Sequence, residues 1–321
     1  MKVIIAEELP SLCPRADRPA PRIITVGLVQ TRWHADASEH KTALSTGIAE
    51  AAHAGAAIVF LQELTMMRYL ADERPNPSKR SDVAEDLTSG PSIEFFRQQA
   101  RESGVFVCAS IFEKTSDDND RGYNTAVMVT PSGELVQRTR KMHIPVTSGY
   151  YEDEYFAHGP ASAEAYPVVS PDAPGKPRLG LPTCWDEWFP EVARIYGLQG
   201  AELLAYPTAI GSEPDYPQFD TQPLWQQVIT ANGIANGLFM IVPNRYGCEG
   251  KITFYGSSFI SDPFGRVLAQ APRDDDAVLV ARLDLEQRQD WLTLFPFYAT
   301  RRPDSYQALL TTGSTANRST E

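Results

Sequence analysis

The sequence predicts one α/β domain in which two β-sheets lie between layers of helices. Apolar, β-branched segments that suit buried strands alternate with segments of helical periodicity, and hairpins occur among them. No shift in composition marks a domain boundary, and no repeat with a period of roughly 20 to 50 residues is present. We therefore expect a domain over residues 22–310, after an N-terminal extension (1–21) and before a disordered tail (311–321).

Composition excludes several classes of protein. The chain has 321 residues, of which 42% are hydrophobic and 22% charged, as in an ordinary soluble globular protein. The formal net charge of −12 argues against a nucleic-acid partner. No apolar segment approaches the roughly 20 residues that a membrane helix needs. The four cysteines lie far apart, which suits a reducing cytoplasm. We expect a cytoplasmic protein with no metal site, no cofactor and no membrane contact.

The first third of the chain predicts a strand–helix–strand unit. Residues 1–21 contain four prolines and are expected to form an arm rather than a core element. A strand over 22–30 precedes a helix over about 37–53, for which Asp36 and Glu39 form a start that resembles a capping box. The next strand, 56–61, leads directly into Gln62 and Glu63.

The remaining elements follow in the same manner. We expect a polar loop over 73–85, a helix over about 91–102, a strand over 105–111, an exposed acidic turn at 117–120 and a hairpin of strands 124–130 and 135–140. Beyond the loop 142–160, the predicted elements are strands near 166–169 and 178–183, a helix from Pro190, a strand over 202–206, a helix over 223–236, strands over 238–242, 254–261, 267–271 and 277–283, and a C-terminal helix and arm over 288–310.

Cys184 is the first candidate for a reactive residue. The strand 178–183 delivers it to a bend that leads into the helix beginning at Pro190. Unpaired N–H groups and the helix dipole at such a bend favour an anion, so we expect a thiol pKa below the reference of about 8.5. The alternative is a structural cysteine, because free cysteines are often buried.

Glu63, Lys141 and Cys184 all stand at the C-terminal ends of predicted strands, where sites collect in α/β folds. A carboxylate can take the proton of a thiol, the thiolate can attack a carbonyl or nitrile carbon, and an ammonium can stabilise the resulting oxyanion. Taken singly, Glu63 could instead cap a helix, and Lys141 could be a solvated strand end.

Three motifs resemble those of the carbon–nitrogen hydrolases of the nitrilase superfamily. They are Leu61-Gln62-Glu63-Leu64, Arg140-Lys141-Met142-His143-Ile144-Pro145 and Cys184-Trp185-Asp186-Glu187-Trp188-Phe189-Pro190-Glu191, and the likeness extends from Arg22 to Leu310. Segments 206–214, 252–260 and 301–306 resemble the N-carbamoylputrescine amidases within that superfamily. The resemblance implies a four-layer α-β-β-α sandwich, a small-molecule substrate and a homodimer or higher homo-oligomer, with the C-terminal arm crossing to the neighbour.

The resemblance also implies roles for individual residues. It implies a catalytic triad of Glu63, Lys141 and Cys184, and a second glutamate, Glu152, that holds the lysine and the substrate amide. The substrate-binding residues that we expect are Tyr150, Trp185, Ala209, Glu213 and Val146. Val146 stands where the putrescine-type enzymes carry an aspartate that helps to hold a distal amine, so Glu213 remains as the candidate partner of that amine. Pro182-Thr183 also replaces a common pair of aliphatic residues.

These features favour a thiol-dependent hydrolase of N-carbamoyl amines, which releases ammonia and CO2 through an acyl- or carbamoyl-enzyme at Cys184. The alternatives are a nitrilase, an aliphatic amidase or a β-ureidopropionase-like enzyme that acts on an uncharged or acidic substrate. A serine hydrolase is disfavoured, because the stretch 255–259 lacks a glycine-rich loop and no G-x-S-x-G motif occurs. The intact triad argues against a non-catalytic binding subunit.

Overall fold

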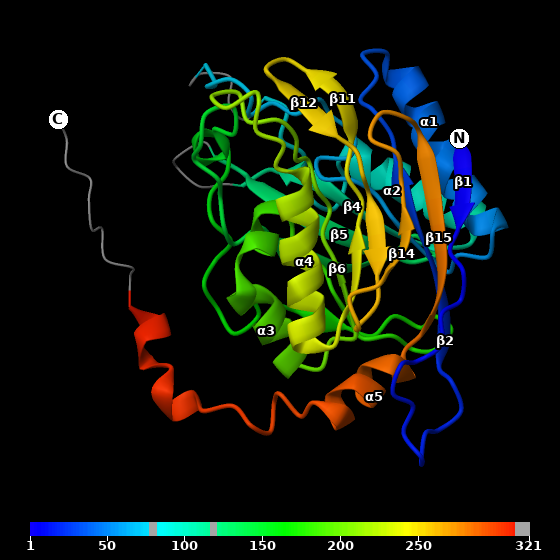
Figure 1. Cartoon of the computed structure of the whole chain (residues 1–321). Coiled ribbons are helices and arrows are strands. Elements are labelled where there is room, and N and C mark those ends of the chain that lie inside the picture. The colour runs from blue at the N-terminus through cyan, green and yellow to red at the C-terminus, as the bar shows by residue number, and fades with distance from the viewer. Residues whose placement is uncertain (77–81, 116–120, 312–321) are drawn as a thin grey trace.

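Two β-sheets pack face to face in the computed structural model, which describes residues 1–76, 82–115 and 121–311 (Figure 1). The first sheet has seven strands, in the spatial order β1 (Lys2–Ile5), β15 (Ala277–Asp284), β2 (Ile23–Gln30), β3 (Ile58–Phe60), β4 (Phe106–Glu113), β5 (Tyr123–Val129) and β6 (Leu135–Arg140). The second has six strands, in the order β14 (Val267–Gln270), β13 (Phe259–Ser261), β10 (Phe239–Val242), β9 (Leu203–Ala205), β8 (Leu179–Gly180) and β7 (Val168–Val169).

Helices cover the outer faces of both sheets. The first sheet is covered by α1 (Ala37–His53) and α2 (Pro91–Ser103), and the second by α3 (Pro190–Leu198) and α4 (Gln222–Asn236). The helix α5 (Glu286–Leu294) follows β15, and β11 (Tyr246–Glu249) pairs with β12 (Ile252–Tyr255) in a separate hairpin. The short 3-10 helices are η2 (Glu152–Glu154), η3 (Cys184–Trp188), η4 (Pro303–Ser305) and η5 (Gln307–Leu310). The predicted α-β-β-α sandwich is thus confirmed.

The central core lies between the two sheets, and strand alternation builds it. In β2, Ile24, Val26 and Leu28 point into this core, whereas Val29 packs in the layer beneath α1 and α2. Gly27 also faces α1: a Cβ placed there would lie 2.8 Å from the Cβ of Ala51, so the glycine permits the close approach of the helix.

Two predicted helix starts are confirmed in atomic detail. The Asp36 carboxylate accepts hydrogen bonds from the backbone N–H groups of Ser38 and Glu39, both at 2.9 Å, at the start of α1. Helix α3 begins at Pro190. The predicted acidic turn at 117–120, residues 77–81 of the predicted polar loop and the tail beyond residue 311 lie outside the described residues.

The structure corrects the sequence-based prediction in three places. The N-terminal segment was expected to contribute no core element, but Lys2–Ile5 forms β1, which pairs in parallel with β15 at the edge of the first sheet. The predicted strand 254–261 is two strands, because Gly256 and Ser257 both have positive φ, of 55° and 57°, which ends β12 before β13 begins. The strand β11 was not predicted.

Candidate active site

The structure brings Glu63, Lys141 and Cys184 together where the two sheets meet at one end of the sandwich. Glu63 follows β3 and Lys141 follows β6, both in the first sheet, whereas Cys184 follows β8 in the second. Backbone hydrogen bonds hold the loops: the Glu63 N–H donates to Thr208 O at 3.2 Å, and the Cys184 N–H donates to Pro207 O at 3.0 Å. Both loops are therefore fixed to the segment that follows β9.

Lys141 forms a buried ion triad with two glutamates. Its Nζ donates to Glu63 Oε1 at 2.8 Å and to Glu152 Oε2 at 2.6 Å, and all three side chains are excluded from solvent. Burial by itself lowers the pKa of Lys141, but the carboxylates of Glu152 and Glu63 outweigh it and raise this pKa well above its ordinary value. The lysine therefore remains an ammonium at neutral pH.

Glu152 has both carboxylate oxygens occupied. Oε2 accepts from Lys141, and Oε1 accepts a hydrogen bond of 2.9 Å from the hydroxyl of Tyr69. Burial raises the pKa of Glu152 to about 7, an effect that the Lys141 charge opposes and the Glu63 charge strengthens. With both oxygens engaged, Glu152 is placed to orient Lys141 rather than to accept a proton from a substrate.

Glu63 presents two unequal oxygens. Oε1 accepts from Lys141 and also from the side-chain amide of Asn124, at 2.6 Å. Oε2 is buried and accepts no hydrogen bond from any residue in the described parts of the chain. A carboxylate oxygen that accepts no hydrogen bond is suited to take a proton from a neighbouring group.

Cys184 begins the 3-10 turn η3 and has a positive φ of 38°. Its side chain lies in a cluster of buried apolar residues, and the residue is 5% exposed. Burial raises the pKa of Cys184 well above its ordinary value, and the negative charge of Glu63 adds to this effect, whereas the charge of Lys141 lowers it. The prediction of a lowered thiol pKa was therefore wrong: desolvation and nearby carboxylates outweigh the bend and its dipole.

Asp186 ties the cysteine turn to the loop that follows Lys141. Its Oδ2 accepts a hydrogen bond from the backbone N–H of Thr183 at 3.2 Å. Its Oδ1 accepts one from the His143 backbone N–H at 3.0 Å and lies 2.7 Å from His143 Nδ1. The His143 ring is stacked on Phe189, with ring centroids 3.7 Å apart. These contacts fix the position of Cys184 relative to Lys141.

A cavity of about 70 Å³ opens onto Cys184. Four of the predicted substrate-binding residues line it, and Glu152 is also in its wall; the lining comprises Pro145, Thr147, Tyr150, Glu152, Cys184, Trp185, Ala209, Ile210 and Glu213. The hydroxyl of Tyr150 donates to Ser212 O at 3.1 Å and accepts from the Gly211 N–H at 3.0 Å. The wall is therefore held together by bonds between the loop after Lys141 and the loop after β9.

Val146 does not belong to this wall, contrary to the prediction. The residue is 65% exposed and is absent from the cavity lining, although Pro145 and Thr147 both belong to it. Residues 143–146 belong to neither a helix nor a strand, so no regular side-chain pattern places Val146 beside its neighbours in the wall.

A family model described as carbon-nitrogen hydrolase matches residues 25–292. The chain belongs to this family. It is 34% identical over 291 residues to a citrullinase of Francisella tularensis, with 89% of this chain and 98% of the relative covered. It is 35% identical over 303 residues to an N-carbamoylputrescine amidase of Arabidopsis thaliana, with 90% and 96% covered. A solved carbon-nitrogen hydrolase from Helicobacter pylori G27 superimposes with a TM-score of 0.81 at 33% identity, over 90% of this chain and 99% of the other.

Three buried residues of this carbon–nitrogen hydrolase were not predicted to be near the site: Asn124, Tyr69 and Arg245. The Arg245 guanidinium donates to the backbone oxygens of Glu63 and Leu64, at 2.6 and 3.0 Å, and pairs with Glu249. Only Asn124 had a sequence signal, because the predicted hairpin places the first residue of strand 124–130 beside Lys141. Tyr69 reaches the site from a loop, and Arg245 from the position before β11; the places of both depend on tertiary packing.

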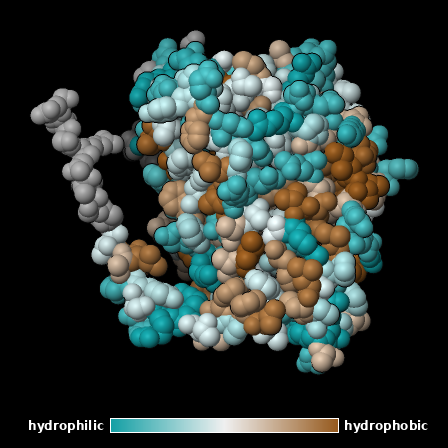
Figure 2. Space-filling view, in the orientation of Figure 1, coloured by the Kyte–Doolittle hydropathy of each residue, from teal (hydrophilic) through white to brown (hydrophobic). Residues whose placement is uncertain are grey.

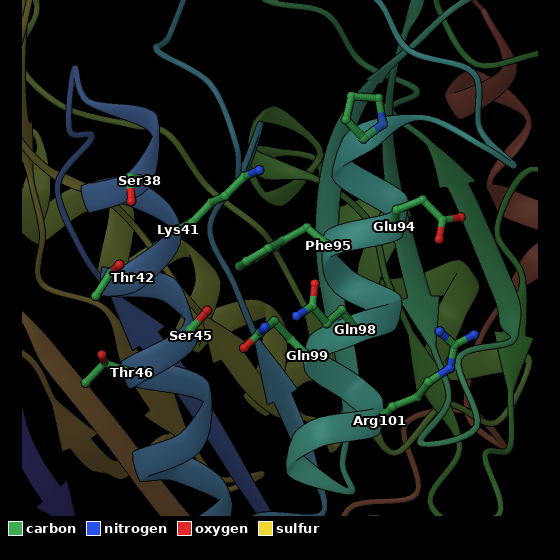
Figure 3. Close-up of a pocket in the computed structure, with 11 residues that line it drawn as sticks. Ser38, Lys41, Thr42, Ser45, Thr46, Glu94, Phe95, Gln98, Gln99 and Arg101 are labelled. Carbon is green, nitrogen blue, oxygen red and sulfur yellow. The ribbon is translucent and has the colours of Figure 1, made fainter.

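A larger hollow of about 770 Å³ lies between α1 and α2 of the hydrolase (Figure 3). Its lining is polar, with side chains such as Thr42 and Gln99, and it contains none of the four predicted catalytic residues. We therefore assign the chemistry to the smaller cavity.

The hydroxyls of Ser257 and Ser258 donate to Tyr255 O and Gln30 Oε1, respectively. Both hydroxyls therefore have a structural role, and neither supports a serine nucleophile.

The described residues contain neither a cluster of metal ligands nor a membrane-spanning helix. Within residues 1–76, 82–115 and 121–311, no group of three or more histidines, cysteines, aspartates or glutamates is arranged to hold a metal ion. In that same part of the hydrolase, no helix has the length and apolar character required to cross a membrane.

Proposed function

We propose that this carbon–nitrogen hydrolase cleaves N-carbamoyl amines that carry a second, positively charged amino group and no carboxylate. Its nucleophile is the Cys184 thiol, its base is Glu63, and Lys141 with the backbone N–H of Trp185 holds the oxyanion. The geometry supports these roles, because the ammonium, the two carboxylates and the thiol lie around one buried point at the end of the sandwich.

The reaction begins with proton transfer from the Cys184 thiol to Glu63. The thiolate then attacks the ureido carbon, and Glu63 returns the proton to the departing ammonia. The resulting thioester-like carbamoyl-enzyme is hydrolysed by a water molecule that Glu63 activates, which gives a carbamic acid that breaks down to CO2 and the free amine. Glu152 keeps Lys141 in place throughout, through the hydrogen bond of 2.6 Å.

The observation that carries the proposed substrate class is the carboxylate of Glu213. It is half-buried in the wall of the cavity that contains Cys184, and among the described residues it has no ion-pair partner. Burial raises the pKa of Glu213, and an ammonium bound beside it would relieve the cost of that desolvation. None of the lining residues carries a positive charge. A ureido amino acid such as citrulline also carries an ammonium, but its α-carboxylate would enter a cavity whose wall already carries the carboxyl groups of Glu152 and Glu213.

The compartment proposed for the reaction is the cytoplasm. All four cysteines are free thiols, which is the state that a reducing cytoplasm maintains.

The experiment compares ammonia release from N-carbamoylputrescine, citrulline, an aliphatic amide and a nitrile, with Cys184→Ala as the inactive control. Glu213→Gln should lower kcat/KM for N-carbamoylputrescine by about ten- to a hundredfold, the value of one charge-assisted hydrogen bond. The same variant should leave hydrolysis of the uncharged amide nearly unchanged. Val146→Asp is the matched control: it adds a carboxylate nearby but outside the cavity, so its effect on kcat/KM should be small.

Two results would contradict the proposal. Hydrolysis of citrulline, the amide or the nitrile faster than N-carbamoylputrescine would reject the substrate class while leaving the thiol chemistry intact. Full turnover by Cys184→Ala would reject the chemistry itself.

A further inference from the structure

Asn124 makes a contact that distinguishes the two oxygens of Glu63. Its side chain is fully buried at the start of β5, and Nδ2 lies 2.6 Å from Glu63 Oε1. The same oxygen accepts from Lys141 Nζ at 2.8 Å. Oε2 of the same carboxylate receives no hydrogen bond from the residues that the structure describes. One oxygen of the carboxylate thus has two donors, and the other has none.

The orientation of the Asn124 amide follows from its second neighbour, Ser110. The backbone N–H of Leu64 donates to Ser110 Oγ at 3.1 Å, and Ser110 Oγ lies 3.0 Å from Asn124 Oδ1. Because Ser110 Oγ already accepts from Leu64, its own proton is available to donate to Asn124 Oδ1. This network assigns the carbonyl of the amide to Ser110 and its NH2 group to Glu63.

The two residues that donate to Glu63 Oε1 are joined to each other by a backbone hydrogen bond. The Lys141 N–H donates to Asn124 O at 2.8 Å, where the start of β5 lies beside the end of β6. The ammonium of Lys141 and the amide of Asn124 therefore approach Glu63 from neighbouring strands of one sheet. A rigid hairpin thereby fixes the direction in which the carboxylate points.

Cys184 needs a base with an unoccupied oxygen. Burial raises the pKa of its thiol, and the Glu63 charge raises it further, so the resting thiol keeps its proton at neutral pH. Within the site, both oxygens of Glu152 already accept hydrogen bonds. Glu63 Oε2 is the carboxylate oxygen of these two glutamates that remains available.

We propose that Asn124 is a positioning residue that, together with Lys141, occupies Oε1 of Glu63 and so directs Oε2 to the Cys184 thiol. The inference rests on the proposed function only in that Cys184 is the nucleophile. In the step concerned, the S–H bond of Cys184 breaks, an O–H bond forms on Oε2, and the electron pair stays on sulfur as a thiolate. Asn124 neither exchanges a proton nor touches the substrate.

The test compares Asn124→Ala and Asn124→Asp with Asn236→Ala. Asn236 is a matched control, because it is also buried, and its amide makes a hydrogen bond of 2.8 Å to Asn232 O within α4, away from the site. The rate of alkylation of Cys184 by iodoacetamide is measured across pH without substrate, and mass spectrometry separates it from the exposed Cys248. Steady-state kcat and KM on N-carbamoylputrescine and the melting temperature are measured on the same samples.

Asn124→Ala should lower both the alkylation rate at neutral pH and kcat by about ten- to a hundredfold, with little change in KM. Asn124→Asp keeps the size of the side chain but replaces the donor by a negative charge. Its losses at neutral pH should be at least as large, and part should be regained at lower pH, where the introduced carboxyl is protonated and can donate to Oε1. Asn236→Ala should change the melting temperature without changing the alkylation profile.

A wild-type pH profile of alkylation in Asn124→Ala would overturn the inference, whatever the change in melting temperature. If that variant does not fold, the isosteric Asn124→Asp decides by the same measurement. Because alkylation needs no substrate, the absence of hydrolysis across all carbamoyl-amines would contradict the proposed function while the alkylation result still decided the role of Asn124.

Discussion

Two residues beside the reacting atoms have positive φ although neither is glycine. Cys184 has a φ of 38°, and Leu64, which follows Glu63, has a φ of 47°. Such conformations cost on the order of 1–3 kcal/mol each and persist only where the surroundings impose them. Here the Cys184 N–H donates to Pro207 O, and the Leu64 N–H donates to Ser110 Oγ. The strained residues are thus Cys184 and the neighbour of Glu63, whose side chains must be held in a defined orientation.

His143 should influence activity through Asp186. Its Nδ1 lies 2.7 Å from Asp186 Oδ1, and Asp186 in turn holds the residue that precedes Cys184. His143→Ala should lower kcat by about tenfold, the value of one hydrogen bond to a buried carboxylate. His143→Asn should retain more activity, because its amide nitrogen can donate from nearly the same place as Nδ1. Steady-state kinetics on the three proteins checks this, and equal activity in all three would exclude such a role.

At the residue scale, the sequence predicted the reactive side chains that directly follow a strand. Glu63, Lys141 and Cys184 could be selected because each follows an apolar strand pattern and the family motifs agree. The fully buried Arg245 could not be selected, since a lone arginine in a loop-like stretch predicts exposure. Val146 was misassigned for a related reason: a position in a motif does not reveal which way its side chain points.

At the scale of elements, the N-terminal segment is fastened to the end of the chain. Besides the pairing of β1 with β15, Arg15 forms ion pairs with Glu286 and Asp290. Arg18 pairs with Asp284 and Asp290. The carboxylate of Asp290 has no exposure to solvent, so it depends on these two arginines for compensation of its charge.

Asp290→Ala should destabilise the protein measurably. The substitution leaves the Arg15 and Arg18 guanidinium groups without their shared carboxylate, which should lower the free energy of unfolding by about 1–3 kcal/mol. The midpoint of urea unfolding measures this change. Arg302→Ala is the control, because Arg302 and Asp304 form an ion pair with both side chains exposed, and its loss should leave the midpoint unchanged. Equal midpoints for Asp290→Ala and the wild type would show that the contacts do not stabilise the fold.

Elements with local signals were predicted well, and elements that depend on distant partners were not. The start of α1 was predicted because Asp36 caps it, and that of α3 because Pro190 suits a first turn. The strand β1 was missed, because its place at the edge depends on β15, which lies more than 270 residues away along the chain. The break between β12 and β13 depends on the positive φ of Ser257, a conformation for which serine carries little signal.

At the scale of the whole molecule, the end of the described chain projects from the sandwich. Tyr298 still contacts the body, because its hydroxyl donates to Asn236 O at 2.9 Å. The C-terminal arm that follows (residues 301–311) extends away from the body in Figure 1, and Figure 2 shows apolar atoms on it. On this arm, Leu309 and Leu310 are 64% and 79% exposed. Exposed apolar side chains on a projecting segment favour burial against another surface.

We propose that a second copy of the chain supplies that surface, in a homodimer or a higher homo-oligomer. Light scattering at micromolar concentration should then give a mass at least twice the 35.5 kDa of one chain. Removal of residues 301–321 should shift the measured mass toward the monomer, because the arm would no longer bury its apolar side chains on a neighbour. A full-length protein that stays monomeric under these conditions would contradict the assembly.

The raised pKa of the buried Cys184 thiol also affects how readily this cysteine is oxidised. Peroxides and disulfides react with thiolates far faster than with thiols, so oxidative damage follows the fraction of each cysteine that is ionised and exposed. Cys184 is buried and holds its proton at rest, whereas Cys248 is exposed on the β11–β12 hairpin. Oxidants in the solvent should therefore react with Cys248 faster than with Cys184, and Cys184 should become more reactive when Glu63 has taken its proton.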